Sequence, residues 1–266
     1  MDFERETMGP LPYAALGSGP PLVVLAGLTP STGVSSDTLM RGAVGAFAAL
    51  ADWRRIVAYN RRPGLARGMS MADFAAEQAD AIRSGLGDSP VDVIGTSTGG
   101  SIAQQLAADH PEVVNRLVLV SSACRLGEQG RRLQRQVAAR IRGGARRKAF
   151  AVMAAGLIPP RRGQTPAGVA GWLLGPHLLP DPRDLDDMAT TIEAEDDFDL
   201  AACRTPIRAP TLILAGHDDR FYSPELFEET HRLIAGSDLR LFDGRGHITV
   251  MRDRGVGAAL GEFLAR

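Results

Sequence analysis

Few cysteines and no long apolar runs are the first features of this chain of 266 residues. Its two cysteines, Cys124 and Cys203, are too few and too far apart for a disulfide framework, and no C-x-x-C pair or Cys/His cluster indicates a metal site. No apolar run approaches the roughly 20 residues that cross a bilayer, and the charged N-terminus lacks the apolar core of a signal peptide. The net charge of −1 favours neither nucleic acid nor an anionic membrane as a partner. We therefore expect a soluble cytoplasmic protein without a metal.

Apolar runs bounded by turn residues alternate with longer helical patterns in the first half of the chain. These patterns predict short strands at 22–26, 55–59, 91–94 and 116–120, and helices at 37–51, 71–86 and 101–109. Ser70 is the predicted N-cap of the second helix. The alternation indicates a parallel sheet covered by helices on both faces, which is an α/β fold.

The alternation stops between about residues 124 and 205. This segment is rich first in arginine, then in proline and glycine, and finally in acidic residues. The alternation resumes with predicted strands at 210–215 and 239–242 and predicted helices at 224–234 and 253–264. We interpret residues 1–123 and 206–266 as one α/β core, and residues 124–205 as a helical cap inserted into that core.

The most specific motif is G-x-S-x-G, formed by Gly95, Ser97 and Gly99 with threonines between them. It lies between a β-branched run and small residues that open a helix, which predicts a sharp strand-to-helix turn with the serine at its apex. Such a turn leaves room only for small residues two before and two after the serine. The helix N-terminus then directs free N–H groups towards the place where an oxyanion would form. A glycine-rich turn with a capping serine is the alternative interpretation.

In this context the motif resembles the nucleophile elbow of the α/β-hydrolase family, and the resemblance covers most of the chain outside the predicted cap. It implies the α/β-hydrolase fold and a serine, an acid and a histidine that follow in this order. Ser97 is then the nucleophile, and His247, after a glycine-rich turn near the C-terminus, is the base. The acid follows a late strand in a G-x-x-D turn, which places it at Asp219, with Asp218 as the rival. In this family a cap commonly covers the site.

The resemblance also implies an oxyanion hole made of two backbone N–H groups, those of Leu28 and Thr98. The family commonly has His-Gly in the first of these loops, whereas this chain has Ala26 followed by glycine. A backbone amide does not need the histidine, and the hydroxyl of Thr29 is a candidate to compensate for its support. The turn at residues 60–64 departs from the family pattern, and we interpret it as structural support below the site.

Together these motifs predict a serine hydrolase that cleaves a small or medium carboxylic ester, lactone or thioester, without a cofactor. The same three residues also serve cofactor-free perhydrolysis, C–C bond hydrolysis and secondary-metabolite tailoring, so these remain alternatives. A further alternative is a non-catalytic ligand receptor on a hydrolase scaffold. The expected partner is a small-molecule substrate, and the sequence leaves the oligomeric state open.

The cap should determine the substrate, and Trp172 and His177 join Thr29 as predicted substrate contacts. Residues 131–148 carry eight basic residues and no acidic one, and residues 181–199 carry nine acidic residues against one arginine. These runs predict either a basic mouth that attracts anions or two solvated helix faces that partly neutralise each other. We favour the second interpretation, and therefore expect a neutral, largely apolar substrate.

Overall fold

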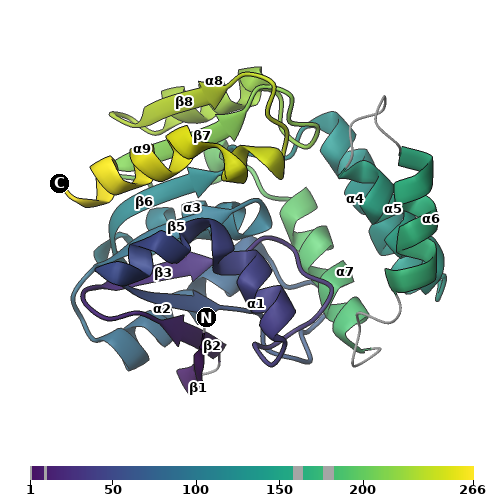
Figure 1. Ribbon diagram of the computed structural model, residues 1–266, viewed down its shortest axis with the longest axis horizontal. Coiled ribbons are helices and arrows are strands. Elements are labelled where there is room, and N and C mark those ends of the chain that lie inside the picture. The colour runs from purple at the N-terminus through teal and green to yellow at the C-terminus, as the bar shows by residue number, and fades with distance from the viewer. Residues whose placement is uncertain (1, 9–10, 158–163, 176–182) are drawn as a thin grey trace.

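The computed structural model describes residues 2–8, 11–157, 164–175 and 183–266. Eight strands form one sheet in the order β1-β2-β4-β3-β5-β6-β7-β8 (Figure 1). The strands are β1 (Glu4–Met8), β2 (Leu11–Leu16), β3 (Pro21–Leu25), β4 (Arg55–Tyr59), β5 (Val91–Thr96), β6 (Val114–Val120), β7 (Thr211–Gly216) and β8 (Asp238–Phe242). All strands from β3 onwards pair in parallel, while β2 runs antiparallel to both β1 and β4. The predicted α/β fold with a mostly parallel sheet is therefore confirmed.

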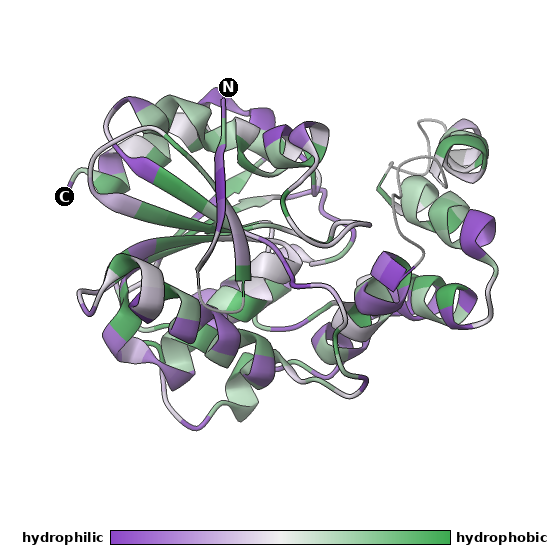
Figure 2. Ribbon diagram, turned by 90° about the horizontal axis from the view of Figure 1, so that it is seen from below, coloured by the Kyte–Doolittle hydropathy of each residue, from purple (hydrophilic) through white to green (hydrophobic). Residues whose placement is uncertain are grey.

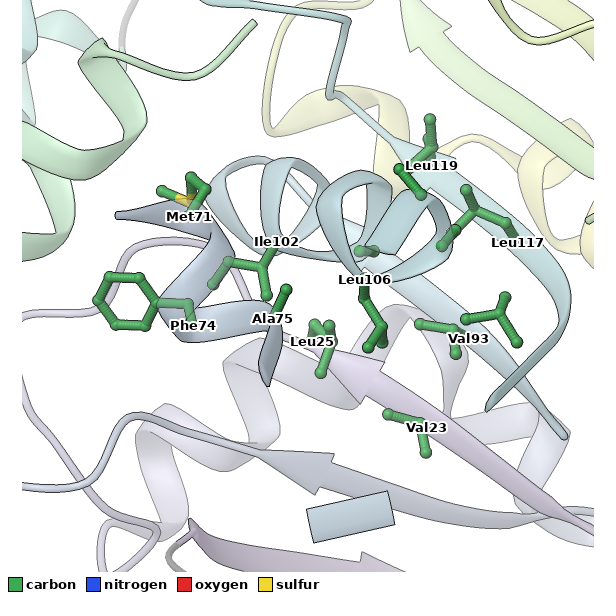
Figure 3. Packing of buried hydrophobic residues seen from close by; sticks show 14 of the residues in the cluster. Val23, Leu25, Met71, Phe74, Ala75, Val93, Ile102, Leu106, Leu117 and Leu119 are labelled. Atoms are coloured by element: carbon green, nitrogen blue, oxygen red, sulfur yellow. The ribbon is translucent and has the colours of Figure 1, made fainter. Parts of the chain in front are cut away.

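Helices cover both faces of the sheet, as Figure 2 shows with the hydrophobic strands enclosed between them. The helices of this layer are α1 (Asp37–Val44), α2 (Met71–Leu86), α3 (Thr98–Asp109), α8 (Pro224–Leu233) and α9 (Arg254–Leu264). Buried residues of α2, α3 and α8 pack on one face, and those of α1 and α9 pack on the other. On the first face, Ile102 and Leu106 of α3 lie beside Leu25 and Val93 of the sheet (Figure 3). Because the strands alternate their side chains between two apolar layers, the sheet holds the loops at its carboxyl edge rigidly.

Local sequence explains why α2 begins where it does. The hydroxyl of Ser70 accepts a hydrogen bond from the Asp73 N–H, and the Asp73 carboxylate accepts one from the Ser70 N–H. This capping box satisfies two donors that the first helical turn leaves free. It confirms the prediction that Ser70 caps a helix over 71–86.

Two parts of the N-terminal region differ from the prediction. The hairpin of β1 and β2 was not predicted, because β1 has the exposed, charged sequence of an edge strand rather than an apolar run. The helix predicted over 37–51 is also divided, because α1 ends at Val44 and a 3₁₀-helix follows over Gly45–Asp52. Gly45 lies at this junction, where glycine's weak helix propensity favours a break.

The described residues between β6 and β7, where the sequence predicts a cap, form four α-helices and a short 3₁₀-helix over Leu200–Ala202. The α-helices are α4 (Glu128–Arg142), α5 (Arg146–Gly156), α6 (Gln164–Leu174) and α7 (Arg183–Asp196). In Figure 1 they lie beside the carboxyl edge of the sheet, with α7 between the sheet and the other three. Apolar residues of α4, α5 and α7 form a cluster of their own. The division into a core and a cap at residues 124 and 205 stays a prediction. Within the described residues, no helix is long and apolar enough to cross a membrane.

Candidate active site

Ser97 lies in the turn that joins β5 to α3, and its backbone is in the left-handed region with a φ of 51°. A non-glycine residue rarely adopts this conformation, and such strain concentrates at functional sites. The flanking glycines make the turn possible. A Cβ at Gly95 would lie 2.6 Å from Gly100 Cα, and a Cβ at Gly99 would collide with the Leu25 carbonyl oxygen. The predicted sharp turn with small residues around the serine is therefore present.

This crowding gives a testable prediction. Gly99→Ala should lower the free energy of unfolding by about 2 kcal/mol or more, because backbone atoms cannot move aside for the added methyl group. Gly257→Ala is the matched control, since a Cβ there meets no atom within 4 Å and the residue lies exposed on α9. Urea unfolding of both variants measures the difference. Equal stability of the two variants would contradict the geometry of this turn.

Ser97, His247 and Asp219 form one hydrogen-bonded chain. His247 Nε2 lies 2.9 Å from Ser97 Oγ, and His247 Nδ1 lies 2.8 Å from Asp219 Oδ2. A carboxylate can only accept, so Nδ1 carries the imidazole proton and Nε2 is free to accept the serine proton. The side chain of Asp219 is fully buried and that of His247 is 8% exposed. The structure thus brings together the three residues that the resemblance selects.

The sequence leaves Asp218 and Asp219 as candidates for the acid, and the hydrogen bonds of the two carboxylates differ. Asp219 Oδ1 accepts hydrogen bonds from the N–H groups of Phe221 and Tyr222, which leaves Oδ2 directed at His247. Asp218 instead exposes 61% of its side chain and lies 3.7 Å from the ring of His217. Asp219, rather than Asp218, therefore contacts the imidazole.

The loop after β3 passes directly by the nucleophile, since a Cβ at Gly27 would lie 3.2 Å from Ser97 Cβ. Leu28 of this loop and Thr98 both line the cavity that contains Ser97. The N–H of Thr98 belongs to the first residue of α3, where a helix leaves its N–H groups free. The positions predicted for the oxyanion hole are therefore adjacent to the serine.

Two buried side chains from the turn after β4 donate hydrogen bonds to the loop after β3. In that loop the family commonly has a histidine, and this chain has Ala26 instead. Asn60 Nδ2 donates to the carbonyl oxygens of Ser31 and Gly33, and Arg61 donates to that of Thr29 at 2.7 Å. Burial lowers the pKa of Arg61 to about 10, although nearby carboxylates oppose the shift. The hydroxyl of Thr29 donates to Ser31 within the loop. The structural role predicted for the turn at residues 60–64 is thus supported for Asn60 and Arg61.

A cavity of about 470 Å³ opens in front of Ser97. Its described lining has no charged side chain apart from the titratable His247, and most of it is apolar. From α4, α5 and α7 it includes Leu133, Gln134, Val137, Met153, Met188 and Ile192, and outside these helices it includes Leu157, Thr29, Phe221 and Ile248. A cavity of this size and composition suits a small or medium apolar ligand.

The predicted substrate contacts have different outcomes. Thr29 lines the cavity, and its contact with a substrate stays a prediction. Trp172 is not among the described residues that line the cavity; it lies on α6 with 44% of its surface exposed, under the guanidinium of Arg147. His177 lies outside the described residues.

Comparison with known proteins agrees with this geometry. A family model described as the alpha/beta hydrolase fold matches residues 20–253. The chain belongs to the α/β-hydrolase fold family. This confirms the predicted resemblance and the prediction that the chain is a hydrolase enzyme.

Two kinds of relative illustrate the match. The chain is 30% identical over 188 residues to a pimeloyl-[acyl-carrier protein] methyl ester esterase of Neisseria meningitidis serogroup C, which covers 68% of this chain and 72% of that protein. Its fold is similar to that of the enol-lactonase from Burkholderia xenovorans LB400, with a TM-score of 0.77 and 20% identity over 99% of this chain and 100% of that one. A hydrolase from Pseudomonas aeruginosa PA01 also gives a TM-score of 0.77, with 22% identity over 100% of this chain and 99% of that one.

In this α/β hydrolase the basic run and the acidic run agree with the prediction only in part. They do neutralise each other in places. Arg131 and Arg135 on α4 pair with Asp196 of α7, and Arg142 pairs with Asp186 and Glu193 of α7.

The prediction of a solvated acidic face on α7 is wrong for three carboxylates. Asp184, Asp187 and Glu195 are all buried against the core. Asp184 accepts from the hydroxyl of Thr32, and Asp187 accepts from the backbone N–H groups of Gly64 and Leu65. Their spacing along α7 places them near one face, the face that also holds buried apolar residues. The sequence could have indicated that these carboxylates are buried, because they share a helix face with apolar residues.

Proposed function

We propose that this α/β hydrolase is a serine hydrolase that cleaves a small or medium carboxylic ester, lactone or thioester through an acyl-enzyme on Ser97. One observation supports the proposal above all others. The chain of hydrogen bonds from Asp219 through His247 to Ser97 ends at a cavity that is large enough for an acyl group and whose described lining, His247 apart, is uncharged. A base oriented by a buried acid is the requirement for activating a serine hydroxyl.

The steps of the proposed reaction follow from these positions. Ser97 Oγ attacks the substrate carbonyl carbon while His247 Nε2 takes the hydroxyl proton, and the N–H groups of Leu28 and Thr98 bind the developing oxyanion. The imidazolium then gives its proton to the leaving oxygen or sulfur, which departs and leaves the acyl group on Ser97. Water attacks this ester with His247 as base, and the carboxylic acid product leaves with the serine restored.

The choice of ester chemistry rests on the relatives, one of which is named for a methyl ester and one for an enol-lactone. A panel of p-nitrophenyl esters and simple lactones, graded by acyl chain length, tests it. We expect turnover that peaks at a short or medium chain. Stoichiometric binding of these compounds without turnover would instead support a receptor, and turnover only with peroxide or a C–C substrate would support the alternative chemistries.

The uncharged cavity also predicts the charge of the substrate. A neutral ester should be hydrolysed with a kcat/KM about tenfold or more above that of its carboxylate-bearing analogue, because the described lining of the cavity offers no cation to a buried carboxylate. This preference should persist between 20 mM and 500 mM salt, since the arginines of α4 that face α7 are paired within the protein. A preference for the anionic ester that disappears with salt would show that the arginine run attracts substrate.

The proposal includes a cytoplasmic location and a small-molecule substrate as the partner. Both cysteines are free thiols, Cys124 buried and Cys203 partly buried, which fits a reducing compartment.

A further inference from the structure

Glu195 of α7 is fully buried beside the nucleophile and accepts four hydrogen bonds. Its Oε2 accepts from the hydroxyl of Thr98 at 2.7 Å and from the amide of Gln134 at 2.9 Å. Its Oε1 accepts from the hydroxyls of Ser101 at 3.0 Å and Tyr222 at 3.1 Å. The four donors come from α3, from α4 and from the loop that carries the acid, so one carboxylate joins three separate parts of the protein.

Two of these donors touch the proposed catalytic machinery directly. Thr98 follows Ser97 in the chain, and its backbone N–H is one of the two proposed oxyanion donors. Tyr222 donates its backbone N–H to Asp219 at 3.2 Å, and its ring stacks on that of His247 with the centroids 6.0 Å apart. Ser97 is therefore the chain neighbour of one partner of Glu195, and Asp219 and His247 both contact another, Tyr222.

We propose that Glu195 is a positioning residue for the reaction, which fixes Thr98 at the oxyanion site and Tyr222 against His247 and Asp219. This inference rests on the proposed function. It makes the seating of α7 on the core a condition for an ordered active site, because α7 supplies the one carboxylate to which donors from α3, from α4 and from the loop after β7 all bind.

The surroundings of Glu195 suit an ionised carboxylate. A carboxylate has about four lone-pair positions, and here each oxygen accepts two hydrogen bonds. No ion pair among the described residues includes Glu195, so hydrogen bonds and the N-terminal end of α3 stabilise the charge. Burial and the neighbouring carboxylates of Glu195 and Asp219 raise the pKa of Tyr222 well above its ordinary value, which keeps the phenol protonated as a donor.

Glu195→Gln tests the inference, because it keeps the shape of the side chain and removes the charge and two acceptor positions. We expect kcat for a p-nitrophenyl ester to fall about 10- to 100-fold while KM changes less than about threefold, since small displacements of reacting groups have effects of this size. Glu193→Gln is the matched control, because Glu193 is an exposed residue of the same helix that pairs with Arg142. Its kcat should equal that of the wild type.

Labelling with a fluorophosphonate separates positioning from loss of folded protein. The final number of labels per chain counts folded sites, and the labelling rate reports how well Ser97 is activated. We expect Glu195→Gln to reach full labelling at a rate about 10- to 100-fold lower. A rate and a kcat within twofold of the wild type, at full labelling, would overturn the inference.

If Glu195→Gln does not fold, Tyr222→Phe decides the question, because it removes one hydrogen bond to Glu195 and keeps the ring on His247. We expect its kcat to fall about 3- to 10-fold with KM unchanged, as for loss of one ordinary hydrogen bond. An unchanged kcat would contradict the inference. Failure of the wild type itself to label or to turn over esters would instead contradict the proposed function.

Discussion

Ser97→Ala is expected to lower kcat for ester hydrolysis by about 10⁴-fold or more, because the other members of a triad cannot act without the nucleophile. The variant should fold, since the methyl group of alanine fits where the serine Cβ already lies. The positive φ of residue 97 strains alanine about as much as it strains serine, so Tm should stay close to that of the wild type.

The control for this variant is Ser84→Ala, which changes an exposed serine in the last turn of α2. Its kcat should equal that of the wild type. The measurement is kcat for a chromogenic ester together with a thermal unfolding curve for each variant. More than a few per cent of wild-type activity in folded Ser97→Ala, purified without wild-type carry-over, would refute the assignment of Ser97.

Asp219→Asn should lower kcat by about 10⁴-fold, by the reasoning that applies to the acid of serine proteases. An asparagine can keep one oxygen for the N–H groups of Phe221 and Tyr222, so its amide NH₂ would face His247 Nδ1. The imidazole would then carry its proton on Nε2 and could no longer accept the proton of Ser97.

Asp218→Asn is the matched control, because Asp218 is the neighbouring carboxylate and is largely exposed. Its kcat should remain within about threefold of the wild type, as for a surface substitution away from the site. Steady-state kinetics of the two variants under one condition measures the difference. The reverse order of effects would show that the acid lies one residue earlier than the structure places it.

The sharp turn that carries Ser97 could be predicted from the sequence because it depends on local backbone constraints. Gly95 and Gly99 leave room for a turn that larger residues would block, and the G-x-S-x-G motif shows this requirement in the sequence alone. The choice between Asp218 and Asp219 depends on which side chain turns towards His247, and that direction is set by the N–H groups of the following residues. The sequence could therefore limit the acid to two positions, and the fold selects one.

The contribution of α7 could not be predicted in the same way. Glu193 and Glu195 are two residues apart in one acidic run, yet the first pairs with Arg142 at the surface and the second is buried against α3. A carboxylate is rarely buried without a partner, and its partners here are distant in the sequence. The β1–β2 hairpin was missed for a related reason, because an edge strand gains its order from pairing with β4 through β2 rather than from an apolar pattern.

The proposed acyl-enzyme on Ser97 is tested most directly by trapping it. Wild-type protein mixed with a p-nitrophenyl ester and quenched in acid within milliseconds should show, by intact mass, one added acyl group per chain. Peptide mapping should place this group on Ser97, and it should be absent from Ser97→Ala. Steady turnover of the ester with no acyl adduct, or with the adduct on another residue, would contradict the account.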